Sequence, residues 1–136
     1  MRFFFYGTLR DPDVRRAVIG PAVGRVAIVR ARLPGYECVF MRGRTYPVLR
    51  PAPGGSVEGV LADHVDAAQA VRIDRFETGE YRAGSAEIAL ATGETVEATV
   101  YFAARPGLAT ARPWRLADWQ RRMKPRLVRG WFRGTP

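Results

Sequence analysis

The aromatic run at residues 3–6, Phe-Phe-Phe-Tyr, followed at once by Gly7, constrains the fold of this chain more than any other feature. Four consecutive aromatic residues are typical of a largely buried β-strand. Gly7 allows a sharp turn or a close approach to a ligand, and Asp11-Pro12 then indicates a helix start with Asp11 as its N-cap. The pattern therefore predicts a strand, a tight turn and a helix, with backbone N–H groups left open in the turn. Such a turn suits a carboxylate or a developing oxyanion, and it also occurs as a corner that binds nothing.

The composition favours one soluble globular domain over residues 1–136. Hydrophobic residues make up 47% of the chain and charged residues 26%, which is typical of a folded rather than a disordered protein. No apolar run is long enough to span a membrane, and the N-terminus lacks the pattern of a signal peptide. Cys38 and His64 are the single cysteine and histidine, so an internal disulfide and a His-rich metal site are excluded. We therefore expect a cytoplasmic protein without a metal ion or cofactor.

The net charge of +9 is concentrated at the C-terminal end. Residues 111–136 hold eight basic residues and one acidic residue, Asp118, so this segment supplies +7 of the total. A basic segment can bind nucleic acid, but the rest of the chain is nearly neutral. This distribution predicts a basic C-terminal segment rather than a nucleic-acid-binding face, and we do not favour nucleic acid as the partner.

Hydrophobic alternation and turn residues predict an α+β fold. We expect strands within 23–33, 36–41, 45–49 and 56–62 and a strand pair around 92–94, with a turn at 34–35 and a loop at 51–55. A middle helix is predicted from Asp63 or Asp66 to about Phe76, and a final helix from 113 to 124, ending at Pro125. Without regular βα alternation, six or seven strands and two or three helices predict a small mixed β-barrel flanked by helices.

A second candidate site residue is Glu77, at the end of the middle helix. A carboxylate at this position faces the negative end of the helix dipole and is destabilised as an anion. Burial against aromatic residues would raise its pKa toward the range useful for proton transfer. The alternative is a solvated glutamate at a helix terminus. Glu80 is a weaker candidate, expected to be exposed in a turn, and Glu58 is expected to be structural.

Three short motifs, taken in order, resemble the γ-glutamylcyclotransferase-like family, which includes the AIG2-like proteins. They are Tyr-Gly-Thr-Leu at 6–9, Val-Glu-Gly-Val at 57–60, and Asp-Arg-Phe-Glu at 74–77 followed by Tyr-Arg at 81–82. The resemblance extends from about residue 2 to residue 102. It implies a small mixed barrel with flanking helices. It also implies a substrate cavity that contains the following residues: Tyr6, Gly7, Thr8, Leu9, Tyr81 and Tyr101, with Glu77 as the catalytic acid and base.

The chemistry that the resemblance implies is release of 5-oxoproline from a γ-glutamyl amine or peptide. The substrate's own α-amino nitrogen attacks its γ-carbonyl, so the protein needs no serine, cysteine or metal nucleophile. Two alternatives remain open at this point: a non-catalytic small-molecule-binding module on the same fold, and an interaction protein that uses its basic C-terminal segment. The sequence specifies neither the leaving amine nor the oligomeric state.

Overall fold

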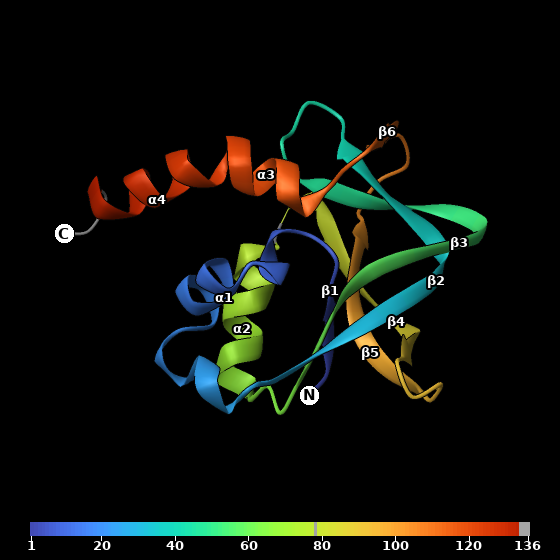
Figure 1. Ribbon diagram of the computed structural model, residues 1–136, viewed down its shortest axis with the longest axis horizontal. Coiled ribbons are helices and arrows are strands. Elements are labelled where there is room, and N and C mark those ends of the chain that lie inside the picture. The colour runs from blue at the N-terminus through green and yellow to red at the C-terminus, as the bar shows by residue number, and fades with distance from the viewer. Residues whose placement is uncertain (78, 134–136) are drawn as a thin grey trace.

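The computed structural model describes residues 1–77 and 79–133. Within them six strands form one mixed sheet: β1 (Phe3–Phe5), β2 (Ala27–Met41), β3 (Pro47–Asp63), β4 (Tyr81–Leu90), β5 (Thr95–Ala103) and β6 (Ala109–Pro113). The α-helices in the described part of the chain are α1 (Pro12–Ile19), α2 (Ala67–Phe76), α3 (Leu116–Arg122) and α4 (Lys124–Arg133). Two 3₁₀ turns, Thr8–Arg10 and Pro21–Arg25, flank α1. Figure 1 shows the barrel on one side and the helices gathered on the other.

Five of these strands close into a barrel. The sheet order is β3-β1-β5-β4-β2-β6, and β2 also pairs with β3, which closes the ring and leaves β6 as an additional strand beside β2. The β1–β5 pair is parallel and the other pairs are antiparallel, so the barrel is mixed. Closure removes exposed sheet edges from the five-stranded ring. The predicted α+β fold, a small mixed barrel with flanking helices, is confirmed.

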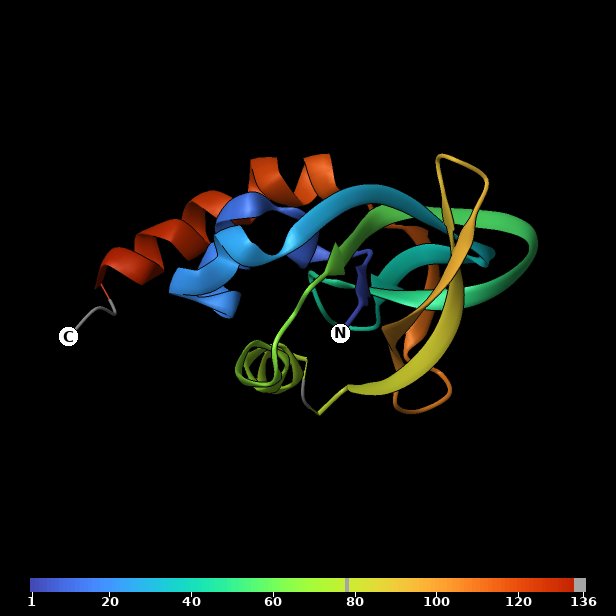
Figure 2. The same ribbon diagram turned by 90° about the horizontal axis from the view of Figure 1, so that it is seen from below.

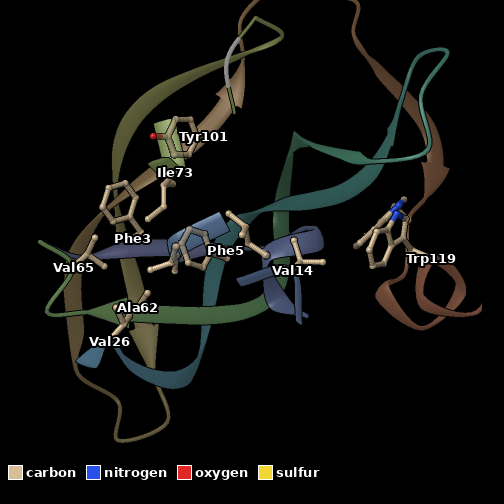
Figure 3. Close-up of a cluster of buried hydrophobic side chains, with 12 residues drawn as sticks. Phe3, Phe5, Val14, Val26, Ala62, Val65, Ile73, Tyr101 and Trp119 are labelled. Carbon is tan, nitrogen blue, oxygen red and sulfur yellow. The ribbon is translucent and has the colours of Figure 1, made fainter. Parts of the chain in front are cut away.

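The aromatic strand β1 lies between β3 and β5, and its side chains alternate between two cores. Phe4 points into the barrel, where it joins a cluster built from strand residues. Phe3 and Phe5 point the other way and pack with Val14 of α1 and Ile73 of α2, as Figure 3 shows. All three phenylalanines are buried. The strand therefore joins the barrel to the helical layer, and the turn after it emerges where the two meet.

Capping residues set the ends of α1 and α2. The Asp11 side chain accepts hydrogen bonds from the backbone N–H groups of Asp13 (2.9 Å) and Val14 (3.1 Å), and Pro12 opens α1, as the sequence predicts. Of the two caps proposed for the middle helix, Asp66 is the one used, in a capping box with Gln69. Figure 2, from below, shows both helices on the same side of the barrel.

The turn expected at 34–35 and the loop expected at 51–55 are wrong. β2 and β3 instead form one long antiparallel ribbon with a register shift between Pro34 and Tyr36. Proline is tolerated at such a bulge because no ladder hydrogen bond depends on its missing N–H. The β2–β3 ribbon therefore bends at the bulge, and the two strands remain paired on both sides of it.

The helix predicted from 113 to 124 is also different in the structure. It begins at Leu116 and stops before Met123, and a further helix, α4, starts at Lys124. Pro125 lies in the first turn of α4, where its missing N–H costs no intrahelical bond. Pro125 thus starts a helix rather than ending one, and the described residues contain four α-helices, more than the two or three expected. The last residues of the basic segment, 134–136, lie outside the described residues.

Candidate functional site

A pocket of about 530 Å³ lies where the barrel meets the helices. Its wall comes from the β1 end and the turn after it, from the start of β3, from the segment joining α2 to β4, and from α3 and α4. This volume lies within the range of roughly 300–1,000 Å³ that small-molecule sites occupy. The structure brings all of the candidate residues around it: Tyr6, Gly7, Thr8, Leu9, Glu77, Tyr81 and Tyr101. Their roles remain predictions.

The turn after β1 lines the pocket with Gly7, Thr8 and Leu9. Arg10 N–H donates to the Gly7 carbonyl (3.0 Å) and Asp11 N–H donates to the Thr8 carbonyl (2.9 Å), which closes a 3₁₀ turn. Such a turn leaves its first N–H groups without internal acceptors. Within the described residues, the N–H groups of Thr8 and Leu9 have no hydrogen-bond acceptor. They are therefore available to an oxygen atom of a bound molecule.

Close packing explains two glycines of the sequence motifs. A Cβ on Gly7 would lie 3.1 Å from Pro47 Cγ, which forms the facing pocket wall. A Cβ on Gly59 would lie 2.4 Å from the Phe5 carbonyl oxygen and 2.5 Å from the Phe4 ring. Gly59 therefore leaves room for Phe4 and Phe5 of the paired strand β1, which carries the turn.

Glu77 lies at the C-terminus of α2, where its N–H donates to the Ile73 carbonyl (3.1 Å) and its side chain reaches the pocket. Burial raises the pKa of this carboxyl group to about 8. The pKa of Glu77 is therefore raised, in the direction that the sequence predicts. At neutral pH the group exchanges a proton easily, which suits a general base that later acts as an acid.

Three tyrosines surround Glu77, and each hydroxyl is held by a hydrogen bond. Tyr6 donates to the Tyr101 carbonyl (2.6 Å), Tyr81 donates to the Pro47 carbonyl (2.5 Å), and Tyr101 donates to Asp74 Oδ1 (3.1 Å). Burial raises the pKa of all three phenols, and the nearby Glu77 charge raises them further. They therefore stay protonated, and Asp74 braces the site through Tyr101.

Glu80, expected to be exposed in a turn, instead lines the pocket and is paired. Its carboxylate accepts hydrogen bonds from Tyr46 and from Arg44 Nε (3.0 Å). The Tyr46 bond, followed by the Arg44 bond, lowers the pKa of Glu80. The pocket thus holds two carboxyl groups whose pKa values shift in opposite directions. Glu80 remains an anion while Glu77 can carry a proton.

Sequence reasoning missed the part of the pocket wall that α3, α4 and the residue between them supply. Trp119, Met123 and Leu127 line the pocket at four-residue spacing, together with Phe76 and Arg126. The i, i+4 spacing of the apolar residues was a detectable signal, but Pro125 suggested that the helix ended before Leu127. Figure 3 shows Trp119 on the side of the core cluster that faces Val14.

Other candidates lie away from this chemistry. Glu58 is exposed on β3, and His64 is exposed between β3 and α2. Burial raises the pKa of the Cys38 thiol to about 12, so it is unreactive at neutral pH. Across residues 1–77 and 79–133, no group of three or more His, Cys, Asp or Glu side chains could hold a metal ion. None of the described helices is long and apolar enough to cross a membrane.

Fold and pocket together define a class: a small mixed barrel with a pocket beside its helices and a carboxyl group of raised pKa in that pocket. The chain belongs to the family described as "Gamma-glutamyl cyclotransferase, AIG2-like", whose model matches residues 3–121. The resemblance stated from the sequence motifs is confirmed.

Relatives and solved structures agree with this assignment. "AIG2-like protein A" of Arabidopsis thaliana is 33% identical over 78 residues, which cover 57% of this chain and 46% of that protein. The chain spans about half the length of the first two curated relatives it matches. A solution structure of an Arabidopsis thaliana protein has a TM-score of 0.68 at 25% identity, covering 99% of this chain and 93% of that one. The crystal structure of an AIG2-like protein from Mus musculus has a TM-score of 0.67 at 23% identity, covers 85% of each chain, and shows the shared fold.

Proposed function

We propose that this protein releases 5-oxoproline from a γ-glutamyl amine or γ-glutamyl peptide by intramolecular cyclisation. The observation that carries the proposal is the placement of Glu77, with its pKa of about 8, in the pocket that the Gly7 turn lines. In this proposal Glu77 exchanges protons and the Gly7 turn supplies N–H donors. Family membership over residues 3–121 supports the same reaction class.

The reaction needs only groups that the substrate and this pocket supply. The substrate's α-amino nitrogen forms a bond to its own γ-carbonyl carbon, giving a tetrahedral intermediate. The nitrogen binds as an ammonium group, so it gives one proton to Glu77 before it attacks and still carries one extra proton once the ring has closed. When the intermediate collapses, the amide C–N bond breaks and Glu77 returns its proton to the leaving nitrogen. The ring nitrogen then loses its extra proton through Glu77 to the released amine, so the products are 5-oxoproline and an ammonium ion, and no water is consumed.

The raised pKa of Glu77 fits both halves of this cycle. A carboxyl group with a pKa of about 8 is mostly protonated in the empty pocket at pH 7. A bound α-ammonium group stabilises the carboxylate, so substrate binding favours the basic form. The protonated form that follows is a ready acid for the leaving nitrogen. General acid–base catalysis of this kind contributes roughly 10²–10⁴-fold.

The turn after β1 supplies the second contribution. The N–H groups of Thr8 and Leu9 can donate to the γ-carbonyl oxygen as it becomes an oxyanion. Loss of one such donor typically costs about 10²–10³-fold in rate. The pocket wall holds the flexible glutamyl chain in the bent form that brings nitrogen and carbonyl together. Tyr6 and Tyr81 fix this wall through their bonds to backbone carbonyls.

The test is 5-oxoproline release from a panel of γ-glutamyl amines and γ-glutamyl dipeptides by the wild-type protein, E77Q and E58Q. E77Q should lower kcat/KM by about 10²-fold or more, because the amide cannot exchange the proton. E58Q removes an exposed carboxylate of β3 and should leave kcat/KM unchanged. Equal activity of E77Q and wild type would refute the role of Glu77. No release from any substrate would instead favour the binding module.

The pH dependence gives an independent readout. Because Glu77 must be ionised to accept the proton, kcat/KM of the wild-type protein should rise with pH up to about 8. E77Q should lose this acidic limb together with its activity. A profile already flat between pH 5 and 7 would mean that another group accepts the proton.

A further inference from the structure

The backbone carbonyl groups of Leu9 and Arg10 lie where the Gly7 turn passes into α1. In a continuous helix they would accept hydrogen bonds from N–H groups three or four residues further on, at residues 12–14. The proline of this stretch has no N–H, and the other two N–H groups donate to the Asp11 side chain (2.9 and 3.1 Å). The helix start therefore leaves these two carbonyls to other donors.

Asp11 is fixed in this capping position from α3 and α4. Its other carboxylate oxygen accepts a hydrogen bond from Gln120 Nε2 (2.9 Å) and pairs with Lys124 (2.8 Å). Asp11 is also fully buried. The N–H groups after Pro12 are therefore held by the cap, and the same carboxylate anchors the start of α4.

Arg15 of α1 supplies the missing donors. Its Nη1 donates to the Leu9 carbonyl (3.0 Å) and to the Arg10 carbonyl (2.7 Å). A helical side chain points back toward the helix N-terminus, so the guanidinium reaches the turn that precedes its own helix. Nη1 carries two hydrogen atoms, one for each carbonyl, and the charge of the guanidinium strengthens both bonds. Arg15 is half-buried and is not among the described residues that line the pocket, so it contacts the turn from outside.

The bond from Arg15 to the Leu9 carbonyl acts on the N–H group of Thr8. Because a peptide unit is planar, a fixed carbonyl also fixes the N–H of the next residue. The Leu9 carbonyl shares its peptide unit with the Arg10 N–H, which donates to the Gly7 carbonyl (3.0 Å). The Gly7 carbonyl in turn shares its unit with the Thr8 N–H. Arg15 therefore orients the Thr8 N–H through two linked peptide units.

The bond from Arg15 to the Arg10 carbonyl acts in the same way on the N–H group of Leu9. The Arg10 carbonyl shares its peptide unit with the Asp11 N–H, which donates to the Thr8 carbonyl (2.9 Å). The Thr8 carbonyl shares its unit with the Leu9 N–H. The two N–H groups that are available to a substrate oxygen thus each depend on one bond from the same Arg15 nitrogen.

We propose that Arg15 is a positioning residue for the cyclisation: it holds the turn after β1 so that the N–H groups of Thr8 and Leu9 are oriented toward the developing oxyanion. This inference rests on the proposed function and adds to it a residue outside the pocket. The oxyanion forms only along the reaction path, and the bound substrate lacks it. Loss of the orientation therefore lowers kcat and kcat/KM together and leaves KM unchanged.

The kinetic test measures 5-oxoproline release by Arg15 variants from each γ-glutamyl compound that the wild-type protein turns over. R15M should lower kcat by about 10-fold or more with KM within about twofold of wild type. R15Q, neutral and too short to reach both carbonyls, should show the same loss, so the test does not depend on one variant. R15K keeps a cation with N–H donors and should retain part of the activity. R16M, which removes the exposed neighbouring cation of α1, is the matched control and should behave as wild type.

Amide hydrogen exchange, followed by NMR, reports on the turn without turnover. The N–H groups of Arg10 and Asp11 should exchange about 10-fold or more faster in R15M than in wild type, because the peptide units that carry them are no longer held. The Gly20 N–H, which donates to a carbonyl near the far end of α1, should exchange at the wild-type rate if the helix is intact. Unchanged exchange at Arg10 and Asp11 would overturn the role of Arg15.

Binding of 5-oxoproline separates this inference from the reaction on which it rests. Its ring carbonyl corresponds to the γ-carbonyl of the substrate, so it should shift the Thr8 and Leu9 amide resonances of wild type and shift those of R15M less. Turnover in which R15M and R15Q keep the wild-type kcat, or lose activity through KM alone, overturns the role of Arg15 while the cyclotransferase stands. Shifts that R15M removes, without turnover by wild type, uphold the positioning and overturn the reaction. Equal shifts or none, again without turnover, overturn both.

Discussion

Because the carboxyl group of Glu77 is buried, we expect its ionisation to destabilise the folded protein. The stability of E77Q relative to wild type should therefore increase as the pH rises. Its pKa is about 8 in the folded protein against 4.5 for an ordinary glutamate. Between these values the folded state holds a proton that the unfolded chain releases. Folding stability therefore falls as the pH rises through this window, and the full penalty is present above pH 8. The neutral amide of E77Q carries no such penalty.

The size of the effect follows from the two pKa values. Between pH 5 and pH 9, proton linkage lowers the unfolding free energy of wild type by about 4 kcal/mol relative to that of E77Q. Water that enters the open pocket screens the carboxylate, so we expect a measured change of about 2–4 kcal/mol. Any constant difference between a protonated carboxyl group and an amide cancels, because only the pH dependence is compared.

Urea unfolding at pH 5, 7 and 9, followed by the fluorescence of the buried Trp114 and Trp119, measures the required free energies. The gap in unfolding free energy between E77Q and wild type should widen at each step. E94Q, which changes an exposed glutamate in the β4–β5 turn, should show no such trend. A gap between E77Q and wild type that stays constant within about 0.5 kcal/mol would refute the reasoning, because Glu77 would then titrate alike in both states.

Three further predictions concern packing, the helix anchor and the thiol. G59A should lower the unfolding free energy by about 1–3 kcal/mol in urea, because the new Cβ would meet Phe4 and Phe5, whereas G24A has open space and serves as the control. Burial opposes ionisation of Asp11, but hydrogen bonds from Lys124 and Gln120 outweigh it and lower its pKa. The stabilisation by ionised Asp11 is present above the ordinary pKa of an aspartate and is lost as the pH falls through the lowered pKa of Asp11. K124M should therefore raise the pH midpoint of acid unfolding, measured by circular dichroism. Cys38, with a pKa of about 12, should react with iodoacetamide at pH 8 about 10³-fold more slowly in the folded than in the urea-unfolded protein, and equal rates would contradict its burial.

Features governed by neighbouring residues could be predicted from the sequence. Asp11 and Asp66 cap their helices through bonds to N–H groups two or three residues away. The β4–β5 pair follows from alternation on both sides of a turn at Gly93. Glu77 could be singled out because a helix end and a following glycine are visible in the chain itself. The sign of its pKa shift needed only the further expectation of burial.

Features governed by distant residues could not be predicted. Pro34 and the prolines near residue 51 indicate turns locally, but pairing along the whole β2–β3 ribbon overrides that preference. Glu80 looks like an exposed turn residue because its partner Arg44 lies 36 positions away. Arg126 lines the pocket from α4, and the start of α4 is anchored by an ion pair between Lys124 and Asp11, 113 residues apart in the chain. None of these contacts leaves a periodic signal in the sequence.

The position of β1 between β3 and β5 in the barrel wall has a consequence for how the protein folds. The three residues of β1 pair with β3 about 57 positions away, and Phe3 also pairs with Thr99 of β5, 96 positions away. The β2–β3 ribbon and the β4–β5 hairpin close far shorter loops, so we expect them to form first. During synthesis the aromatic strand β1 therefore remains unpaired until most of the chain has been made. Because the Gly7 turn directly follows β1, we expect the site to be completed only when β1 pairs with β3 and β5.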